Sequence, residues 1–155
     1  MIGSDPFLEA HSRIITPEVF EFVFDNELKR AVRSQNFLTF VSIEARSGNG
    51  ADGDTIREVA RLISHEIRGT DLLTVTPHGR LAIVLLDADM SQALRVVDRL
   101  LAHLEPYAFA APLNFDIGAA CCPTDGCDAD ALRRAAARNA GTLRSGPGGA
   151  GSSTS

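Results

Sequence analysis

Two groups of residues have spacings that could support chemistry with a metal ion or a dinucleotide. Asp87 and Asp89 stand two positions apart, as metal-binding carboxylates can, and Gly48-x-Gly50-x-x-Gly53 matches the dinucleotide fingerprint. A dinucleotide site needs a following parallel strand with an acid near its end, whereas Leu72 to Thr76 leads straight into a hairpin. The sequence therefore favours a flexible glycine loop, and a strand end with a helix cap for the two aspartates.

Cysteines and histidines are the next candidates, because both can bind metals. Cys121, Cys122 and Cys127 share one segment, but an odd number fits neither a disulfide framework nor a four-ligand zinc site. The four histidines form no HExxH or Ser-His-Asp pattern. His78 lies in a predicted turn, where it is either an exposed turn residue or a contact for a partner. These residues therefore predict incidental thiols and no metal site.

The composition predicts one domain that binds neither nucleic acid nor membrane. A chain of 155 residues with 45% hydrophobic content can bury one core. It has no apolar run of membrane-spanning length and no signal-peptide pattern, so we expect a cytoplasmic protein. The net charge of -5 argues against general nucleic-acid binding. Lys29 is the only lysine, and the arginines that carry the remaining charge suit bidentate contacts with phosphate or guanine.

Hydrophobic periodicity predicts the elements that must position these residues. Helical spacing indicates helices over 16–34, with Thr16 as cap, over 54–67, from the Asp89 cap to just before Pro106, and over 128–143. Strands are expected over 37–45, 72–76, 81–87 and 113–120. After the first helix this order is βαββαβα, which contains the ferredoxin-like βαββαβ unit. We therefore predict an α+β fold, a mainly antiparallel sheet with helices packed on it.

The domain is expected to span residues 16–144. Residues 1–15 are interpreted as an N-terminal extension, and 145–155 as a disordered Gly/Ser-rich tail. The same order of elements occurs in nucleotide-cyclase and polymerase palms and in pure binding domains, so it does not decide the function.

Five segments, in order, resemble those of GGDEF domains, the diguanylate cyclases of bacterial signal transduction that make cyclic di-GMP. They are FLTFVSIEA (37–45), GDTIREVARLI (53–63), RGTD (68–71), FDIGAACCPTDG (115–126) and ALRRAAARNAG (131–141). The resemblance covers nearly the whole predicted domain. It implies the palm fold of nucleotide cyclases, with a signature motif at the turn of the hairpin.

The signature itself is degenerate in this chain. Its five positions hold, in order, Pro77, His78, Gly79, Arg80 and Leu81. In the family, a strand-end aspartate and a signature acid hold magnesium. Glu44 aligns with the first as a remnant, while Gly79 and Arg80 replace the acidic pair.

Other parts of the family's site are also replaced. Pro77 and His78 stand in place of the glycines that approach the nucleotide. The helix that reads guanine shrinks to a short loop, and Leu143 stands where the last helix supplies a phosphate-binding lysine. The resemblance therefore implies no catalytic residue, metal or cofactor in this chain.

One ligand motif is retained. Arg68-x-x-Asp71 stands where the family has an inhibitory site for cyclic di-GMP. Arginine can donate two hydrogen bonds to guanine O6 and N7, and a carboxylate can accept from N1 and N2. Alternatively, Arg68 stabilises a helix C-terminus while Asp71 begins a turn.

The leading prediction is a catalytically inactive GGDEF-like signalling or interaction module. It either binds cyclic di-GMP at Arg68 and Asp71 or keeps only a surface for a protein partner or a flanking signalling domain. The first alternative is a cyclase or another phosphoryl-transfer enzyme that uses Glu44 with one magnesium ion. The second is a purely structural dimerisation domain, since related domains act in pairs.

Overall fold

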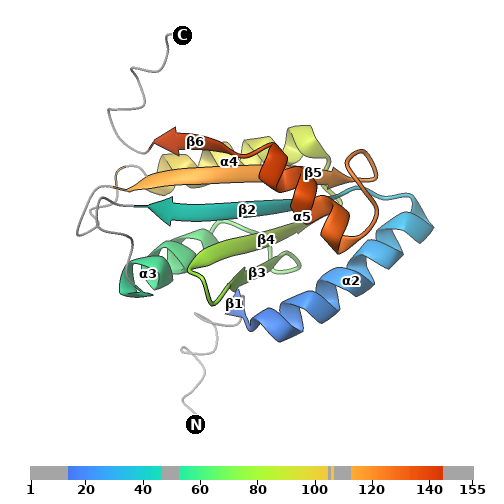
Figure 1. The fold of residues 1–155 in the computed structure, drawn as a ribbon, viewed down its shortest axis with the longest axis horizontal. Helices are drawn as coiled ribbons and strands as arrows, with labels where there is room; N and C mark the ends of the chain where they lie inside the picture. Colours follow the sequence, from blue (N-terminus) through green and yellow to red (C-terminus); the bar gives the residue numbers. More distant parts are fainter. Residues whose placement is uncertain (1–13, 47–52, 105, 107–112, 145–155) are drawn as a thin grey trace.

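The computed structural model describes residues 14–46, 53–104, 106 and 113–144, which form one sheet with helices on both of its faces (Figure 1). The elements in chain order are β1 (Ile14–Ile15), α2 (Pro17–Ser34), β2 (Leu38–Arg46), α3 (Gly53–Ser64), β3 (Leu72–Val75), β4 (Arg80–Leu86), α4 (Met90–Leu104), β5 (Asn114–Cys122), α5 (Ala129–Arg138) and β6 (Gly141–Arg144). None of the helices in these ranges is long and apolar enough to cross a membrane.

The strand order is β1-β3-β4-β2-β5-β6. Every neighbouring pair is antiparallel except β1 with β3. The inner order β3-β4-β2-β5 is that of the ferredoxin-like βαββαβ unit, and the predicted α+β fold is confirmed. β2 lies between β4 and β5, so its residues have a partner on each side.

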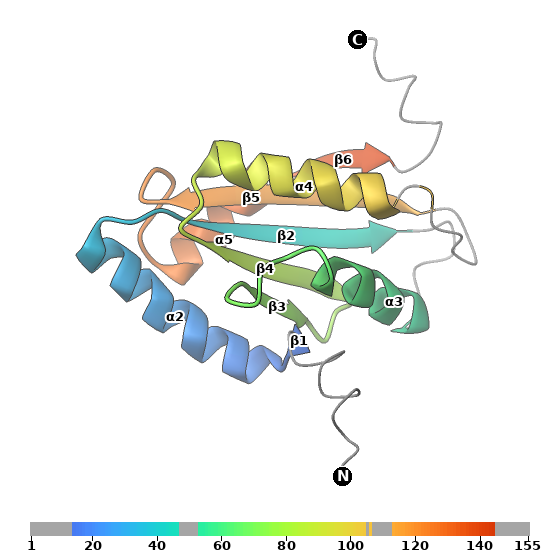
Figure 2. The same cartoon turned by 180° about the vertical axis from the view of Figure 1, so that it is seen from behind.

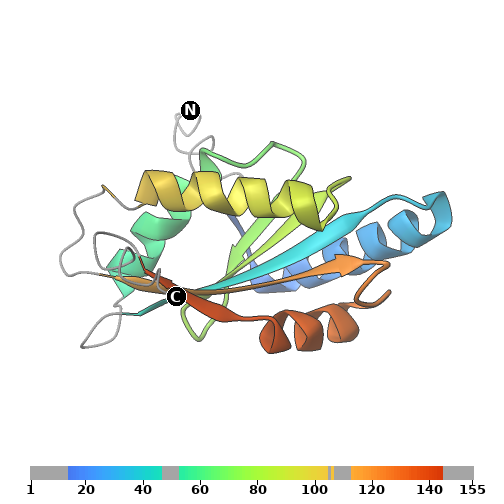
Figure 3. The same cartoon turned by 90° about the horizontal axis from the view of Figure 1, so that it is seen from above.

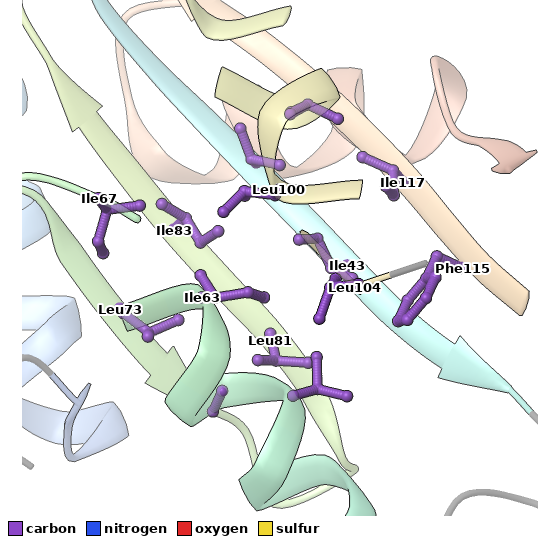
Figure 4. Packing of buried hydrophobic residues seen from close by; sticks show 14 of the residues in the cluster. Ile43, Ile63, Ile67, Leu73, Leu81, Ile83, Leu100, Leu104, Phe115 and Ile117 are labelled. Atoms are coloured by element: carbon purple, nitrogen blue, oxygen red, sulfur yellow. The ribbon is translucent and has the colours of Figure 1, made fainter. Parts of the chain in front are cut away.

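Each face of the sheet is covered by one pair of helices. α3 and α4 lie on one face and α2 and α5 on the other, as Figures 2 and 3 make plain. Figure 4 shows the first core, in which residues of α3, α4 and the turn after α3 point at the strands; its labelled members are Ile43, Ile63, Ile67, Leu73, Leu81, Ile83, Leu100, Leu104, Phe115 and Ile117. The second core is rich in phenylalanine and alanine; its largest members are Phe20, Phe24, Leu28, Leu38 and Phe40. Each face of this sheet therefore carries a buried core, and the apolar residues of β2 divide between the two cores.

Two helix caps, Thr16 and Asp89, fall where the sequence predicts them, whereas Asp54 lies within the first turn of α3. The Thr16 hydroxyl accepts a hydrogen bond from the main-chain N–H of Val19 at 3.3 Å, and Pro17 follows in the first turn. Asp89 forms a reciprocal capping box with Gln92, in which both hydrogen bonds are 2.9 Å long. Asp89 is thus a helix cap, as the sequence favours.

The predicted last helix is too long. α5 ends at Arg138, and Gly141–Arg144 form β6, which pairs with Asn114–Ile117 of β5. The Asn139 side-chain amide donates to the main-chain carbonyl of Ala119 at 3.1 Å, and the chain turns back along β5. The alanine-rich periodicity extends past this point, but the unpaired edge of β5 offers the backbone better partners. Leu143 therefore lies in a strand, and the comparison with a lysine of the last helix is wrong.

Three smaller boundaries also differ from the prediction. Ile14 and Ile15, assigned to the N-terminal extension, pair with Leu73 and Thr74 of β3 and so belong to the folded unit. α3 ends at Ser64, although Ile67 beyond it remains buried. β5 continues past residue 120 to Cys122. The predicted glycine loop at 47–52, the remaining extension and the tail from 145 lie outside the described residues.

Gly118 allows α5 to lie directly on β5. A Cβ at Gly118 would come within 2.1 Å of the main-chain carbonyl oxygen of Ala136. No real contact is this short, and the obstacle is helix backbone, which cannot rotate away. Close packing of the alanine-rich helix therefore requires glycine at this strand position.

We expect Gly118→Ala to lower the free energy of unfolding by on the order of 3 kcal/mol, because α5 must move off the sheet. Urea denaturation measures this loss. Gly141→Ala is the matched control, since a Cβ there meets nothing within 4 Å. Equal stability of the two variants would contradict the close approach.

Candidate functional site

A cavity of about 430 Å³ opens on the sheet face that carries α2 and α5. Its floor consists of residues from β2, β3, β4 and β5, and its walls come from α2 and α5. The two helices cover the half of this face that holds the second core and leave the rest open. Charged side chains replace apolar ones on the exposed half, and the turn between β3 and β4 lies beside them.

Glu44 is the centre of the charged floor. The sheet register sets it opposite Arg80 on β4 and opposite Asp116 on β5. Arg80 Nη2 lies 3.3 Å from Glu44 Oε1, and Arg46 Nη2 lies 3.2 Å from the same oxygen. Arg46 Nη2 also lies 3.2 Å from Asp116 Oδ2. The guanidinium groups of Arg80 and Arg46 thus converge on one Glu44 oxygen, and the Arg46 group also contacts Asp116.

These arginines set the ionisation of Glu44. Partial burial raises the pKa of the Glu44 carboxyl group, but the hydrogen bonds and positive charges of Arg46 and Arg80 lower it by more. The net pKa of Glu44 lies below its ordinary value of 4.5. The folded protein therefore favours the ionised carboxylate, with the arginines supplying its counter-charge.

This donor set does not fit a magnesium ion. Magnesium needs several oxygen ligands in near-octahedral geometry, and both carboxylates of the floor already contact arginine. Within the described parts of the chain, no three His, Cys, Asp or Glu residues are grouped so that they could hold a metal ion.

The turn between β3 and β4 uses its own N–H groups internally. Gly79 adopts φ +78°, its N–H donates to the Thr76 carbonyl at 2.9 Å, and the Arg80 N–H donates to the Thr76 hydroxyl at 3.2 Å. Pro77 has no N–H to offer. Leu81 is fully buried in the core, whereas His78 is exposed and lines the cavity. The turn is thus a closed structural unit, with Gly79 required for its left-handed conformation.

Arg133 forms part of the α5 wall and was not singled out by the sequence. Its guanidinium lies 5.4 Å from the centre of the Phe24 ring and 5.7 Å from that of Phe40, and these two rings stack at 5.4 Å. It also pairs with Glu21 of α2. Only packing of α2 and α5 on one sheet face brings these residues together, so no local sequence signal marks them.

Arg68 and Asp71 lie away from this cavity, by the opposite face of the sheet. The Asp71 carboxylate is buried and accepts four hydrogen bonds, two of them from the Arg68 guanidinium at 3.1 and 3.2 Å. The other two come from the main-chain N–H groups of Arg68 at 3.0 Å and of Leu86 at 3.1 Å. Arg68 also donates to the Leu86 carbonyl. Asp71 therefore ties the start of the hairpin to its end.

The Arg68 side chain is 58% exposed and lines a second hollow of about 240 Å³. Arg99, from α4, lines the same hollow and pairs with Glu66 at 3.4 Å. No local sequence signal marks Arg99, because nothing in the spacing of α4 indicates that its outer face meets the turn after α3. Two arginines from separate elements thus meet in one hollow.

Comparison with known proteins identifies the architecture. The sequence matches no family model and no curated protein. Among solved structures, the GGDEF domain of YfiN (TpbB) from Pseudomonas aeruginosa is 21% identical, with a TM-score of 0.69 and coverage of 86% of this chain and 88% of that one. The fold is that of GGDEF domains.

Two further structures share it. The active GGEEF domain of a diguanylate cyclase from Vibrio cholerae is 16% identical, with a TM-score of 0.72 over 81% of this chain and 87% of that one. The coiled coil and GGDEF domain of DgcB from Caulobacter crescentus, solved in complex with c-di-GMP, is 11% identical, with a TM-score of 0.66 over 86% and 81%. At identities this low, the structural similarity establishes the fold alone. The chemistry of the site depends on the residues of this chain.

The lowered pKa of Glu44 predicts a specific pH dependence of stability. Because the folded-state pKa lies below 4.5, the stabilisation is complete above that pH and is lost as the pH falls through the folded-state pKa. The difference in free energy of unfolding between wild type and Glu44→Gln should be full near neutral pH and should shrink as the pH falls below 4.5 and through the lowered pKa. Urea denaturation across this range measures it. When Arg46→Gln and Arg80→Gln are combined, the stability difference due to Glu44 should no longer depend on pH in this way. If the pH dependence persisted in that double variant, the two arginines would not be the cause of the lowered pKa.

Proposed function

We propose that this chain is a non-catalytic signalling module with the fold of a diguanylate cyclase. The observation that carries the proposal is the ion pair between Glu44 and Arg80, whose side chains lie 3.3 Å apart on neighbouring strands. By resemblance, these are the strand-end metal position and one of the two acidic signature positions. The Arg80 guanidinium therefore occupies the place where a diguanylate cyclase would need a metal ion.

Arginine at this position opposes metal binding in a way that solution conditions cannot reverse. A guanidinium keeps its charge at any physiological pH and offers no lone pair to a cation. Arg46 adds a second positive charge at the same Glu44 oxygen. A divalent ion would have to displace both arginines and would still lack the second acid that supports phosphoryl transfer.

The turn supports the same proposal through its hydrogen bonds. Triphosphates are commonly held by main-chain N–H groups in glycine-rich turns. Here the N–H groups of Gly79 and Arg80 donate within the turn, and Pro77 has none. These groups are not free to hold phosphates, so metal and phosphate recognition are weakened together.

A cyclase assay tests the absence of catalysis. With GTP and either magnesium or manganese, the purified chain should make no cyclic di-GMP above the level of a blank, while an active diguanylate cyclase run in parallel makes product. Glu44→Ala should be indistinguishable from wild type in this assay. Product formed by the wild type and abolished in Glu44→Ala would instead support the enzymatic alternative.

The second hollow favours a finer role, that of a cyclic di-GMP receptor. Arg68 and Arg99 both line it, and each presents a guanidinium about half exposed to solvent. Arginines suit guanine edges and phosphates alike. Asp71 contributes by holding the Arg68 guanidinium in place, since its carboxylate is already occupied by four hydrogen bonds. In this role the two arginines contact the ligand and Asp71 positions one of them.

Calorimetric titration of cyclic di-GMP tests the receptor role. We expect Arg68→Ala and Arg99→Ala each to weaken binding about ten-fold or more, because each removes a charged hydrogen-bond donor. Arg57→Ala is the matched control, since Arg57 is exposed on α3 and pairs with Asp54 of the same helix. Absence of binding by the wild type, or equal affinity in all three variants, would refute a site in this hollow. Asp71 is left intact, because its removal would break four hydrogen bonds and destabilise the domain.

A further inference from the structure

A row of small residues crosses the floor of the large cavity. The sheet register sets Ser42 of β2 opposite Ala82 of β4 and opposite Gly118 of β5, and all three line the cavity. On the same face of β2, Phe40 lies on one side of this row and Glu44 on the other. Because neighbouring strands lie about 4.8 Å apart, small residues on three of them leave a trough roughly 10 Å long. The floor is therefore hollowed between an aromatic row and a charged row.

The wall of this trough on the Phe40 side is apolar. Phe20 of α2 and Ala136 and Ala137 of α5 line the cavity there. α5 lies so close to Gly118 that it covers the β5 end of the trough. Figure 1 shows α2 and α5 over the part of the sheet where β2 begins, whereas the part where β2 ends is left uncovered. A ring that entered from the uncovered side would contact aromatic and alanine side chains and lose its contact with water.

The opposite wall presents two guanidinium groups. The side chains of Arg46 and Arg80 are 58% and 53% exposed. Among the described residues, their contacts with carboxylates are all made through Nη2. A guanidinium has five N–H donors, so both arginines keep donors for a further acceptor. Because both Nη2 atoms lie within 3.3 Å of one Glu44 oxygen, a single anionic group can accept hydrogen bonds from both arginines.

We propose that this cavity binds an aromatic organic anion. The ring lies in the trough against Phe40, and the carboxylate, sulfonate or phosphate group accepts hydrogen bonds from Arg46 and Arg80. A volume of about 430 Å³ is within the usual range for small-molecule sites. The site is separate from the hollow that holds Arg68, and it uses neither a metal ion nor the N–H groups of the turn between β3 and β4. The inference therefore goes beyond the receptor role and does not depend on it.

The charges of this wall make a specific demand on the ligand. Arg46 and Arg80 carry two positive charges, and Glu44 and Asp116 carry two negative ones. The wall is thus electrically balanced, and an anion is held by short-range hydrogen bonds while Glu44 competes for the same donors. Removal of the Glu44 charge should therefore strengthen the binding of an anion. The same change would weaken the binding of a ligand whose ammonium group paired with Glu44.

Two fluorescent probes that share one aromatic body test the proposal. Anilinonaphthalene sulfonate carries an anionic group, whereas N-phenylnaphthylamine has the same rings without it. Each probe is titrated against the folded full chain at neutral pH. We expect the sulfonate probe to bind about ten-fold more tightly, because only this probe accepts charge-assisted hydrogen bonds. Equal affinity of the two probes, or no binding of the sulfonate probe, would overturn the proposal.

Variants locate the two parts of the site. Arg46→Gln and Arg80→Gln should each weaken the sulfonate probe about ten-fold and leave the neutral probe unchanged. Glu44→Gln should tighten the sulfonate probe several-fold. Ser42→Leu places a large side chain in the trough and should weaken both probes. Arg68→Ala is the matched control, since Arg68 lines the other hollow, and it should bind both probes as wild type does.

The contrary outcomes are equally specific. Full sulfonate binding in both arginine variants, or weaker binding in Glu44→Gln, would show that the anion is not held at this wall. Loss of binding in Arg68→Ala would place the probe in the other hollow. Displacement of the sulfonate probe by an equal concentration of GTP would identify a nucleotide site instead. Urea denaturation verifies that each variant is folded, and if Ser42→Leu is not, the partly exposed residues Arg46, Arg80 and Glu44 decide the question.

Discussion

The pairing of β2 with both β4 and β5 is the constraint from which the site follows. β2 is bonded along its length to β5 and from Leu38 to Glu44 to β4. This register places Glu44 between Arg80 and Asp116, with Arg46 two residues further along the same face. The ion pairs are partly exposed, so they contribute little net stability. The apolar residues of β2 hold the register, and the register fixes which charges meet.

The cavity arises because the two helix layers cover the sheet unequally. α3 and α4 pack on large aliphatic side chains that fill their face of the sheet. α5 lies almost on the backbone of β5 at Gly118, and together with α2 it shields the half of its face that holds the phenylalanine cluster. The charged ends of the central strands remain open beside the helices. Close packing on small residues thus creates the space that a ligand or partner could enter.

A diguanylate cyclase shares this fold, and the site around Glu44 in this chain has its own electrostatic arrangement. Fold alone does not determine function, which depends on the residues of the site. Around Glu44 the counter-charge is built into the chain as arginine. Around Asp71 a ligand-like motif also serves the fold, since the buried carboxylate joins both ends of the hairpin while the Arg68 guanidinium stays accessible. Asp71 is thus the structural member of this motif, and Arg68 is the member that we propose to bind a ligand.

The four helices and the four inner strands could be predicted from the sequence, because helical periodicity, caps such as Thr16 and Asp89, and alternation in the strands are local signals. It also indicated the GGDEF resemblance, whose fold the solved structures bear out. It could not determine that residues 141–144 leave the helix, since that depends on the free edge of β5. Nor could it place Arg46 with Asp116, Arg133 with Glu21, or Arg99 beside Arg68. Each of these contacts joins separate elements, and only the packing of two helix layers on a fixed strand register brings such side chains within reach of one another.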